Sequence, residues 1–198
     1  MAGIQKAKRE EAARKLLEAA VACVAEQGID ALHVREIARR AGYSVGSVYK
    51  YYADLDEILI AVNTITLGRI KAVVGEAIIG KDDPMDRLKA LARAYHSFAL
   101  ENRKLWEALF GHRLPDDRPI PEIHLKENAA LLAVIGQSLL ELSPKMSAEQ
   151  LEARKRTCFA AVHGLVLINL ENRFVGLSGE VFMREMDFLV ERLATATV

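Results

Sequence analysis

Cysteine is nearly absent from this chain, and proline is scarce. Its 198 residues include two cysteines, Cys23 and Cys158, and five prolines. Two thiols so far apart in sequence rule out a disulfide framework and a zinc ribbon, and low thiol usage is typical of a reducing cytoplasm. We therefore expect a cytoplasmic protein in which both cysteines are small buried hydrophobic residues.

Targeting and membrane-spanning segments are also missing from the pattern. Residues 1–15 are highly charged and are followed by no apolar core of the signal-peptide type. No run reads as long and apolar enough to cross a bilayer, so no membrane partner is expected. Strand-type alternation is rare, whereas Ala, Leu, Glu, Arg and Lys are abundant, which favours an all-α fold.

Signatures of catalysis and metal binding are not found either. The five histidines, at positions 33, 96, 112, 124 and 163, form no His-Glu-x-x-His pattern. The sequence has no nucleophile elbow and no glycine-rich phosphate loop. We predict that the protein is not an enzyme and has no catalytic residues, no metal site and no cofactor. A small helical enzyme and a helical adaptor that does not bind DNA stay open as alternatives.

Charge is balanced overall but unevenly distributed. The chain has 27 Lys and Arg against 27 Asp and Glu. Residues 1–53 hold nine basic and six acidic residues, and residues 54–198 hold eighteen and twenty-one. A positive N-terminal part on a mildly acidic body is a weak indication of a nucleic-acid partner.

Helical periodicity and capping residues predict the order of elements. Short helices give way to long ones near Ala53, which predicts one domain over 1–53 and a second over 54–198. Asp54 and Glu57 have the spacing of a capping box, as do His33 and Glu36. The predicted helices cover residues 6–27, 34–41, 45–52, 55–79, 84–100, 102–111, 121–142, 147–174 and 178–195.

Residues 34–52 have the residue types of a helix-turn-helix at the required spacing. Ala38, four positions after Val34, is small enough for two crossing helices to approach closely. Gly42 permits the left-handed turn, and Val48 anchors the second helix in the core. Val45 and Tyr52 share the inward face with Val48.

The other face of the second helix carries polar groups. Gly46 lets backbone approach a groove, Ser47, Tyr49 and Tyr51 offer hydroxyl donors, and Lys50 offers a cation. Phosphate oxygens and base edges accept hydrogen bonds from such groups. The helix start at Ser44 adds amide donors for a phosphate. This face therefore predicts binding to double-stranded DNA.

The segment VREIARRAGYSVGSVYKYYADLDEIL, residues 34–59, resembles the DNA-binding segment of the TetR/AcrR family of bacterial transcription regulators. The resemblance covers about residues 10–62 and implies a three-helix helix-turn-helix domain followed by a helical ligand-binding and dimerisation domain. It implies phosphate contacts from Ser47, Tyr49 and Tyr51, and base reading by Val45, Gly46, Lys50 and Arg35. Two positions depart from the family pattern: Tyr43 replaces a valine and Leu55 replaces a lysine that commonly contacts the DNA backbone.

The body is expected to bind a ligand and a second copy of the chain. Aromatic and polar residues in apolar helices are candidates for a ligand cavity, with ordinary core packing as the alternative: Tyr95, His96, Phe98, Trp106, Phe110, Asn128 and Asn169. The last two helices have broad apolar faces that suggest a homodimer through a four-helix bundle. The candidate interface residues are Phe159, Val162, His163, Gly164, Val166 and Leu189.

Together these features predict a ligand-responsive, DNA-binding transcription regulator. The resemblance implies a repressor that binds a pseudo-palindromic operator as a homodimer and is released by a small-molecule inducer. The sequence does not identify the inducer.

Overall fold

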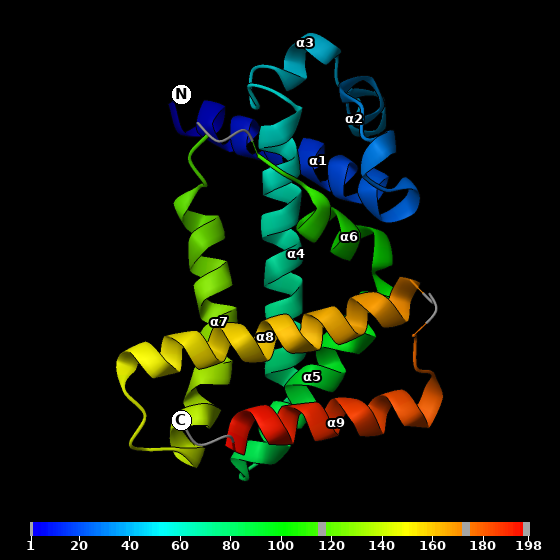
Figure 1. Cartoon of the computed structure of the whole chain (residues 1–198). Helices are drawn as coiled ribbons and strands as arrows, with labels where there is room; N and C mark the ends of the chain where they lie inside the picture. The colour runs from blue at the N-terminus through cyan, green and yellow to red at the C-terminus, as the bar shows by residue number, and fades with distance from the viewer. Residues whose placement is uncertain (1, 115–117, 172–174, 196–198) are drawn as a thin grey trace. The chain divides into compact units, whose positions relative to one another are not determined.

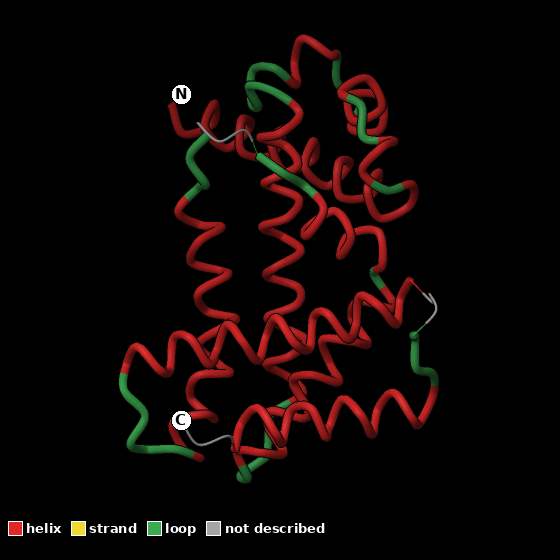
Figure 2. The backbone as a smooth tube through the Cα atoms, viewed as in Figure 1, coloured by secondary structure: helices red, strands yellow, loops and turns green. Residues whose placement is uncertain are grey.

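The computed structural model describes residues 2–114, 118–171 and 175–195. Within these residues every regular element is helical and no strand is present (Figures 1 and 2). The chain divides into two compact units. The first contains residues up to Gly68 together with Asn102–Leu125, and the second contains Arg69–Glu101 and the residues from Lys126 onward. These units are defined by compactness, so the functional boundary predicted at residue 53 stays a prediction.

Most observed helices follow the predicted ones closely, but the helix predicted over 45–52 ends at Val48. The first unit contains α1 (Ala2–Gln27), the 3-10 turn η1 (Ile29–Ala31), α2 (Val34–Ala41), α3 (Val45–Val48), the first part of α4 (Leu55–Ala77), α6 (Arg103–Gly111) and the start of α7 (Glu122–Leu142). The second contains the rest of α4 and α7, with α5 (Pro84–Glu101), α8 (Ala148–Glu171) and α9 (Gly179–Thr195). The helix predicted to end at residue 174 is described only as far as Glu171, and residues 172–174 lie outside the description.

The core of the first unit joins α1 to the helix-turn-helix. Leu16 and Val24 of α1 are buried in one cluster with Ile37 of α2, Val48 of α3 and Leu105 of α6. Burying side chains of this size stabilises a fold by about 1.5–3 kcal/mol each relative to leaving them exposed. This cluster fixes the orientation of α3, so that the opposite face of the helix turns to solvent.

The turn between α2 and α3 requires glycine. Gly42 has φ 74° and ψ 31°, in the left-handed region, and its N–H donates to the carbonyl oxygens of Ala38 and Arg39. The Tyr43 N–H donates to the Ala38 oxygen at 2.9 Å. A side chain at position 42 would strain this backbone, as the helix-turn-helix pattern predicts.

Two of the predicted helix starts differ in detail. The Glu57 N–H donates to Asp54 Oδ1 at 2.9 Å, but the Glu57 carboxylate accepts from Ala53 N–H at 2.6 Å, one residue earlier than expected. His33 forms no side-chain cap on α2. Its predicted partner Glu36 binds Arg39 and Arg40 instead, because these guanidinium groups lie one turn away on the same helix face.

The expectation that no run is apolar enough to span a bilayer was too strict for α4. Leu55–Ala77 passes such a test by length and composition, with a mean hydropathy of 1.5. Half of its most apolar stretch is buried within the protein, as happens in a core helix of a globular fold. Its apolar side chains are used inside the fold: residues such as Ile58, Val62, Ile70 and Val74 are all buried.

The second unit is a bundle in which α9 packs on both α5 and α8 (Figure 1). Its interior contains Phe98 of α5, Leu139 of α7, Val166 of α8 and Met186 of α9. On α7, a methyl group added to Gly136 would lie 2.7 Å from Cδ of the Lys155 side chain on α8, so this lysine would have to move to make room for it.

Candidate nucleic-acid interface and ligand pocket

The start of α3 is held by two serines. Ser47 N–H donates to Ser44 Oγ at 3.2 Å, and the two hydroxyl oxygens are 2.8 Å apart. Val48 is completely buried, whereas Val45 is 37% exposed. Val45 therefore does not share the inward face as predicted. It lies in the first turn of a four-residue helix, ahead of the packing contact that Val48 makes, and it stands on the solvent side with Gly46.

The neighbouring tyrosines have different roles. Tyr49 is 54% exposed and lies beside exposed Lys50. The regular helix ends at Val48, and a turn continues through Tyr51, which is half-buried against the core. Tyr52 is also half-buried, and its hydroxyl donates to the Ala13 carbonyl oxygen at 3.3 Å, which ties the turn to α1. Tyr49 and Lys50 are thus the groups most available to a partner.

A cationic hollow adjoins this face. Its lining combines residues of α1 with the turn after α3: Gln5, Lys8, Arg9, Lys50 and Tyr51. Among the described residues no ion pair is found for Lys8, Arg9 or Lys50. From the sequence, the basic residues of α1 were either a solvated face or, for Lys6 or Lys8, an arm that touches DNA; the position of Lys8 and Arg9 beside the turn after α3 was not predicted.

Other cations of the first unit are paired with acids. Arg14 binds Glu11 and Glu18 on its own helix. On α2, Arg39 and Arg40 bind Glu36, and these hydrogen bonds lower the pKa of Glu36 from its ordinary value to about 2. Arg35, the predicted contact on α2, is exposed, and no ion pair is found for it among the described residues.

The start of α4 is neutralised by a distant segment of the first unit. Arg118, between α6 and α7, binds both carboxylate oxygens of Asp54, and this contact holds the pKa of Asp54 well below its usual range. His112 Nε2 lies 3.1 Å from Asp56 Oδ1. The sequence offered no signal for Arg118, because it lies 64 residues from its partner.

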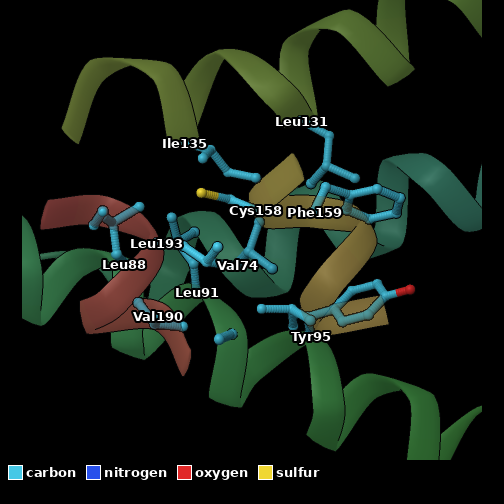
Figure 3. Close-up of a pocket in the computed structure, with 13 residues that line it drawn as sticks. Val74, Leu88, Leu91, Tyr95, Leu131, Ile135, Cys158, Phe159, Val190 and Leu193 are labelled. Carbon is cyan, nitrogen blue, oxygen red and sulfur yellow. The ribbon is translucent and has the colours of Figure 1, made fainter. Parts of the chain in front are cut away.

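A small apolar pocket lies inside the second unit (Figure 3). Its cavity volume is about 60 Å3. It is lined by residues of α4, α5, α7, α8 and α9, of which only Tyr95 and Cys158 have a polar side-chain atom: Val74, Leu88, Leu91, Ala92, Tyr95, Leu131, Ile135, Cys158, Phe159, Val162, Val190, Leu193 and Ala194. On α5 the lining residues recur at helical spacing, a pattern that does not distinguish a pocket wall from an ordinary core.

Tyr95 presents its ring to this pocket and its hydroxyl to a histidine. The Tyr95 oxygen is 2.8 Å from His163 Nδ1, and in Figure 3 it points away from the aliphatic side chains. Phe159 stacks on His163 with ring centroids 5.7 Å apart and meets the edge of Tyr95 at 5.8 Å. Burial lowers the pKa of His163, which favours a neutral imidazole beside the tyrosine.

A second buried histidine lies farther along α5. His96 Nε2 lies 3.2 Å from Asn169 Oδ1, and the Asn169 amide donates to the Leu177 carbonyl oxygen. The ring of Phe182 lies 4.4 Å from that of His96 between centroids. His96, Asn169 and Phe182 border a shallower hollow near the start of α9.

The structure separates the seven predicted ligand residues. Tyr95 lines the pocket, while His96 and Asn169 form the pair beside the second hollow. Phe98 is buried but does not line either hollow. Asn128 is exposed on α7, so a cavity role does not suit it.

Trp106 and Phe110 belong to the first unit rather than to the pocket-bearing unit. Trp106 is 1% exposed and Phe110 is 39% exposed, with ring centroids 5.2 Å apart. The core-packing alternative therefore describes Trp106. Helical periodicity alone did not separate the two units, because α6 follows α5 directly in sequence.

The predicted interface residues are mostly turned inward. Val162 and Val166 are buried, so these two have little surface left for a partner. Phe159 lines the pocket and His163 is bound to Tyr95, although both side chains stay partly exposed. Gly164 and Leu189 are only partly covered. The outward apolar residues of α8 and α9 are others, one or two positions in sequence from the buried residues of each helix: Leu167, Ile168, Val181 and Phe188.

Comparisons with known proteins give a family match for each of the two parts of the chain. A family model described as bacterial regulatory proteins, tetR family, matches residues 16–62. Another, described as the tetracyclin repressor-like C-terminal domain, matches residues 88–193, more than half of the chain. Together these models cover the helix-turn-helix and most of the pocket-bearing unit.

Two curated relatives carry the same protein name in different bacteria. The HTH-type transcriptional regulator BetI of Rhizobium meliloti (strain 1021) is 30% identical over 100 residues, 49% of this chain and 49% of that protein. BetI of Yersinia pestis (strain Pestoides F) is 24% identical over 193 residues, 95% of this chain and 90% of that protein. The match thus spans about half of the first relative and nine-tenths of the second, and both relatives are regulators rather than enzymes.

Solved structures share the fold. A protein with unknown function from Rhodococcus sp. RHA1 superposes with a TM-score of 0.74 at 24% identity, covering 92% of this chain and 95% of that one. The transcriptional regulator FadR from Bacillus subtilis, in complex with stearoyl-CoA, superposes with a TM-score of 0.68 at 16% identity, covering 92% and 97%.

Proposed function

This chain belongs to the TetR family of bacterial regulatory proteins, and on that premise we propose that it is a cytoplasmic, ligand-responsive repressor. It binds a pseudo-palindromic operator as a homodimer and is released when a small molecule enters the second unit. Residues 1–53 act as the DNA-binding domain, and residues 54–198 act as the ligand-binding and dimerisation domain.

One observation carries the DNA-binding proposal: the outward face of α3 and its turn present hydrogen-bond donors that the fold does not use. Tyr49 is 54% exposed, Lys50 is exposed, and the adjoining hollow adds Lys8 and Arg9. Cations and hydroxyls in this arrangement contact phosphates, while groups at the start of the recognition helix, Val45 and Gly46, meet base edges in the major groove.

The remaining predicted contacts support the same surface to different degrees. Ser44 and Ser47 are bound to each other at the helix start, and the Ser47 N–H already donates to Ser44, so the pair offers a phosphate the Ser44 backbone amide and one shared hydroxyl pair. Arg35 extends from α2. Tyr51 borders the cationic hollow with Lys8 and Arg9, and in this proposal its hydroxyl donates to the DNA backbone whose phosphates these two cations neutralise.

Dimerisation is proposed through the outward residues of α8 and α9. Phe188 is 52% exposed and carries Arg192 over its ring at 5.2 Å, while Leu167 and Ile168 stand on α8. Two copies that pair these faces form a four-helix bundle and present two recognition helices to successive major grooves, about 34 Å apart.

The ligand acts through α4 in this proposal. Val74, near the end of α4, lines the pocket, and Ile58, near its start, belongs to the core beneath the helix-turn-helix. A ligand releases DNA only to the extent that it binds the two states of the dimer differently, and a coupling of about 1–3 kcal/mol corresponds to roughly 5- to 150-fold.

DNA binding is tested by selection of bound fragments from sheared genomic DNA, followed by fluorescence anisotropy on the selected duplex. Lys50→Ala should weaken specific binding and relax the preference at one base pair, while Lys81→Ala, which changes an exposed lysine of the second unit, serves as the control. Log affinity should fall steeply with log salt. Unchanged affinity in Lys50→Ala, or a flat salt response, would remove the proposed groove placement.

The interface is tested by light scattering. Phe188→Glu should convert a dimer to a monomer at micromolar concentration, because it places a charge in the proposed apolar contact. Leu140→Glu makes a similar change on α7, at a residue that is 39% exposed, and should leave the dimer intact. A wild-type monomer, or a dimer that survives Phe188→Glu, would contradict this interface.

A further inference from the structure

The pocket of the second unit offers a bound molecule very few polar partners. Of its lining side chains, only those of Tyr95 and Cys158 carry a polar atom. The Tyr95 hydroxyl is held by His163 Nδ1 at 2.8 Å. Burial raises the pKa of the Cys158 thiol, so the sulfur stays protonated and is only a weak hydrogen-bond donor.

Charge is excluded as well. None of the lining side chains is ionisable at neutral pH. Arg154 is the charged group near Cys158; it is not among the lining residues, and its guanidinium donates to the Leu193 carbonyl oxygen at 2.7 Å. An anion or cation in this pocket would lose its hydration and find no counter-charge among the lining residues.

We propose that the ligand of this pocket is an uncharged, compact, hydrocarbon-like molecule, which deepens the proposed function by naming the class of its inducer. It is held by burial of apolar surface and by close contact with aliphatic and aromatic walls, chiefly Leu91, Leu131 and Phe159. The proposal rests on the proposed function only for its regulatory consequence.

The size of the cavity adds a second constraint. Its volume of about 60 Å3 is less than half of the roughly 150 Å3 of an apolar cavity that holds benzene. A ligand must therefore push wall side chains apart as it enters. One of these walls is Val74 of α4, the helix through which the proposed release of DNA acts.

The test uses two pairs of compounds that differ in charge at nearly equal size: toluene with benzoate, and naphthalene with naphthalene-2-sulfonate. Isothermal titration calorimetry of the full chain should show one site per chain for at least one hydrocarbon. The matching anion should bind at least about 100-fold more weakly, because its charge is desolvated without a partner. Equal affinity for an anion, or no binding of either hydrocarbon, overturns the proposal.

Variants locate the site. Ala92→Leu fills the cavity from α5 and should abolish hydrocarbon binding while the melting temperature is kept. Ala133→Leu makes the same change at an exposed position of α7 and should bind as the wild type does. If Ala92→Leu does not fold, Leu131→Ala decides: it enlarges the cavity and should tighten naphthalene binding relative to toluene, and an unchanged ratio overturns the location.

A parallel titration of the operator complex separates this inference from the proposed function. If the hydrocarbon binds but operator affinity does not change, the ligand class stands and the induction mechanism fails. If an anion binds in the pocket and releases the operator, the regulatory function stands and the inference about ligand class is wrong.

Discussion

The recognition face of α3 and the pocket of the second unit use tyrosine in opposite ways. Tyr49 lies on the surface with its polar end available, whereas Tyr95 turns its ring to a cavity and commits its hydroxyl to His163. The same side chain thus supplies a hydrogen-bond donor in one region and an apolar wall in the other. What decides the role is whether a neighbouring residue of the fold already binds the hydroxyl.

The largest expected effect concerns the aromatic pair of α6, which the sequence made candidates for a ligand cavity with core packing as the alternative. Trp106→Ala should lower the free energy of unfolding by about 3–5 kcal/mol, because it empties a buried site. Phe110→Ala, at a half-exposed position one turn on, should cost much less. Chemical denaturation measures both, and equal losses would contradict the assignment of Trp106 to the core.

Gly42, before α3, and Gly46, within α3, should affect different properties: the first the stability of the fold and the second the binding of DNA. Gly42→Ala should cost about 1–2 kcal/mol of stability, because residue 42 has a left-handed backbone. Gly46→Ala has open space around its added methyl group and should leave stability unchanged or slightly raised. The Gly46→Ala variant should lose operator affinity alone. An unaltered affinity would show that position 46 does not approach DNA.

Tyr52 and Tyr49 provide a smaller test on neighbouring residues. Tyr52→Phe should destabilise the first unit by about 0.5–1.5 kcal/mol, because the Ala13 carbonyl oxygen loses its donor. Tyr49→Phe should not change stability and should weaken binding about equally on all DNA sequences. Thermal melts measure the stability of both variants, and fluorescence anisotropy measures their DNA affinity. If Tyr49→Phe lowered stability and Tyr52→Phe weakened only DNA binding, the assigned roles of the two tyrosines would be reversed.

The smallest effect at neutral pH is the titration of the buried histidines. Burial lowers the pKa values of His96 and His163, so the unfolded chain binds protons at a higher pH than the folded chain does. Stability should therefore be constant above pH 7 and fall as pH drops below about 6.5, the unfolded value.

Melting temperatures between pH 8 and pH 5.5 measure this dependence. His163→Gln should make the profile less steep without flattening it, because burial also lowers the pKa values of His96 and His124. His33→Gln, at an exposed position, should leave it unchanged. A profile that is flat in the wild type would show that neither histidine is held neutral by the fold.

Much of the fold was predictable because its signals are local. The spacing of Ala38, Gly42 and Val48 placed the helix-turn-helix, and the bounds of α2 were predicted without error. The partial exposure of Val45 was missed because α3 is only four residues long. Its first turn is not packed against the core, so Val45 does not follow the hydrophobic periodicity of a longer helix.

The site in the second unit was less predictable because it depends on contacts between distant segments. Only Tyr95 of the ligand candidates lines the pocket. The candidates were polar and aromatic residues, whereas most of the residues that line the pocket are aliphatic. The pairing of Arg118 with Asp54 was missed for the same reason: charge complementarity across 64 residues has no periodic signature.

The position of α6 has a practical consequence for anyone who builds hybrid regulators. Leu105 of α6 shares the buried cluster beneath the helix-turn-helix, and Arg118 neutralises Asp54. A recognition module excised at residue 53 or 68 would leave an uncovered apolar patch, and a module that ends at residue 68 would also leave the Asp54 carboxylate without Arg118. A transplant of this chain's operator specificity should therefore carry residues 102–125 along with the N-terminal segment.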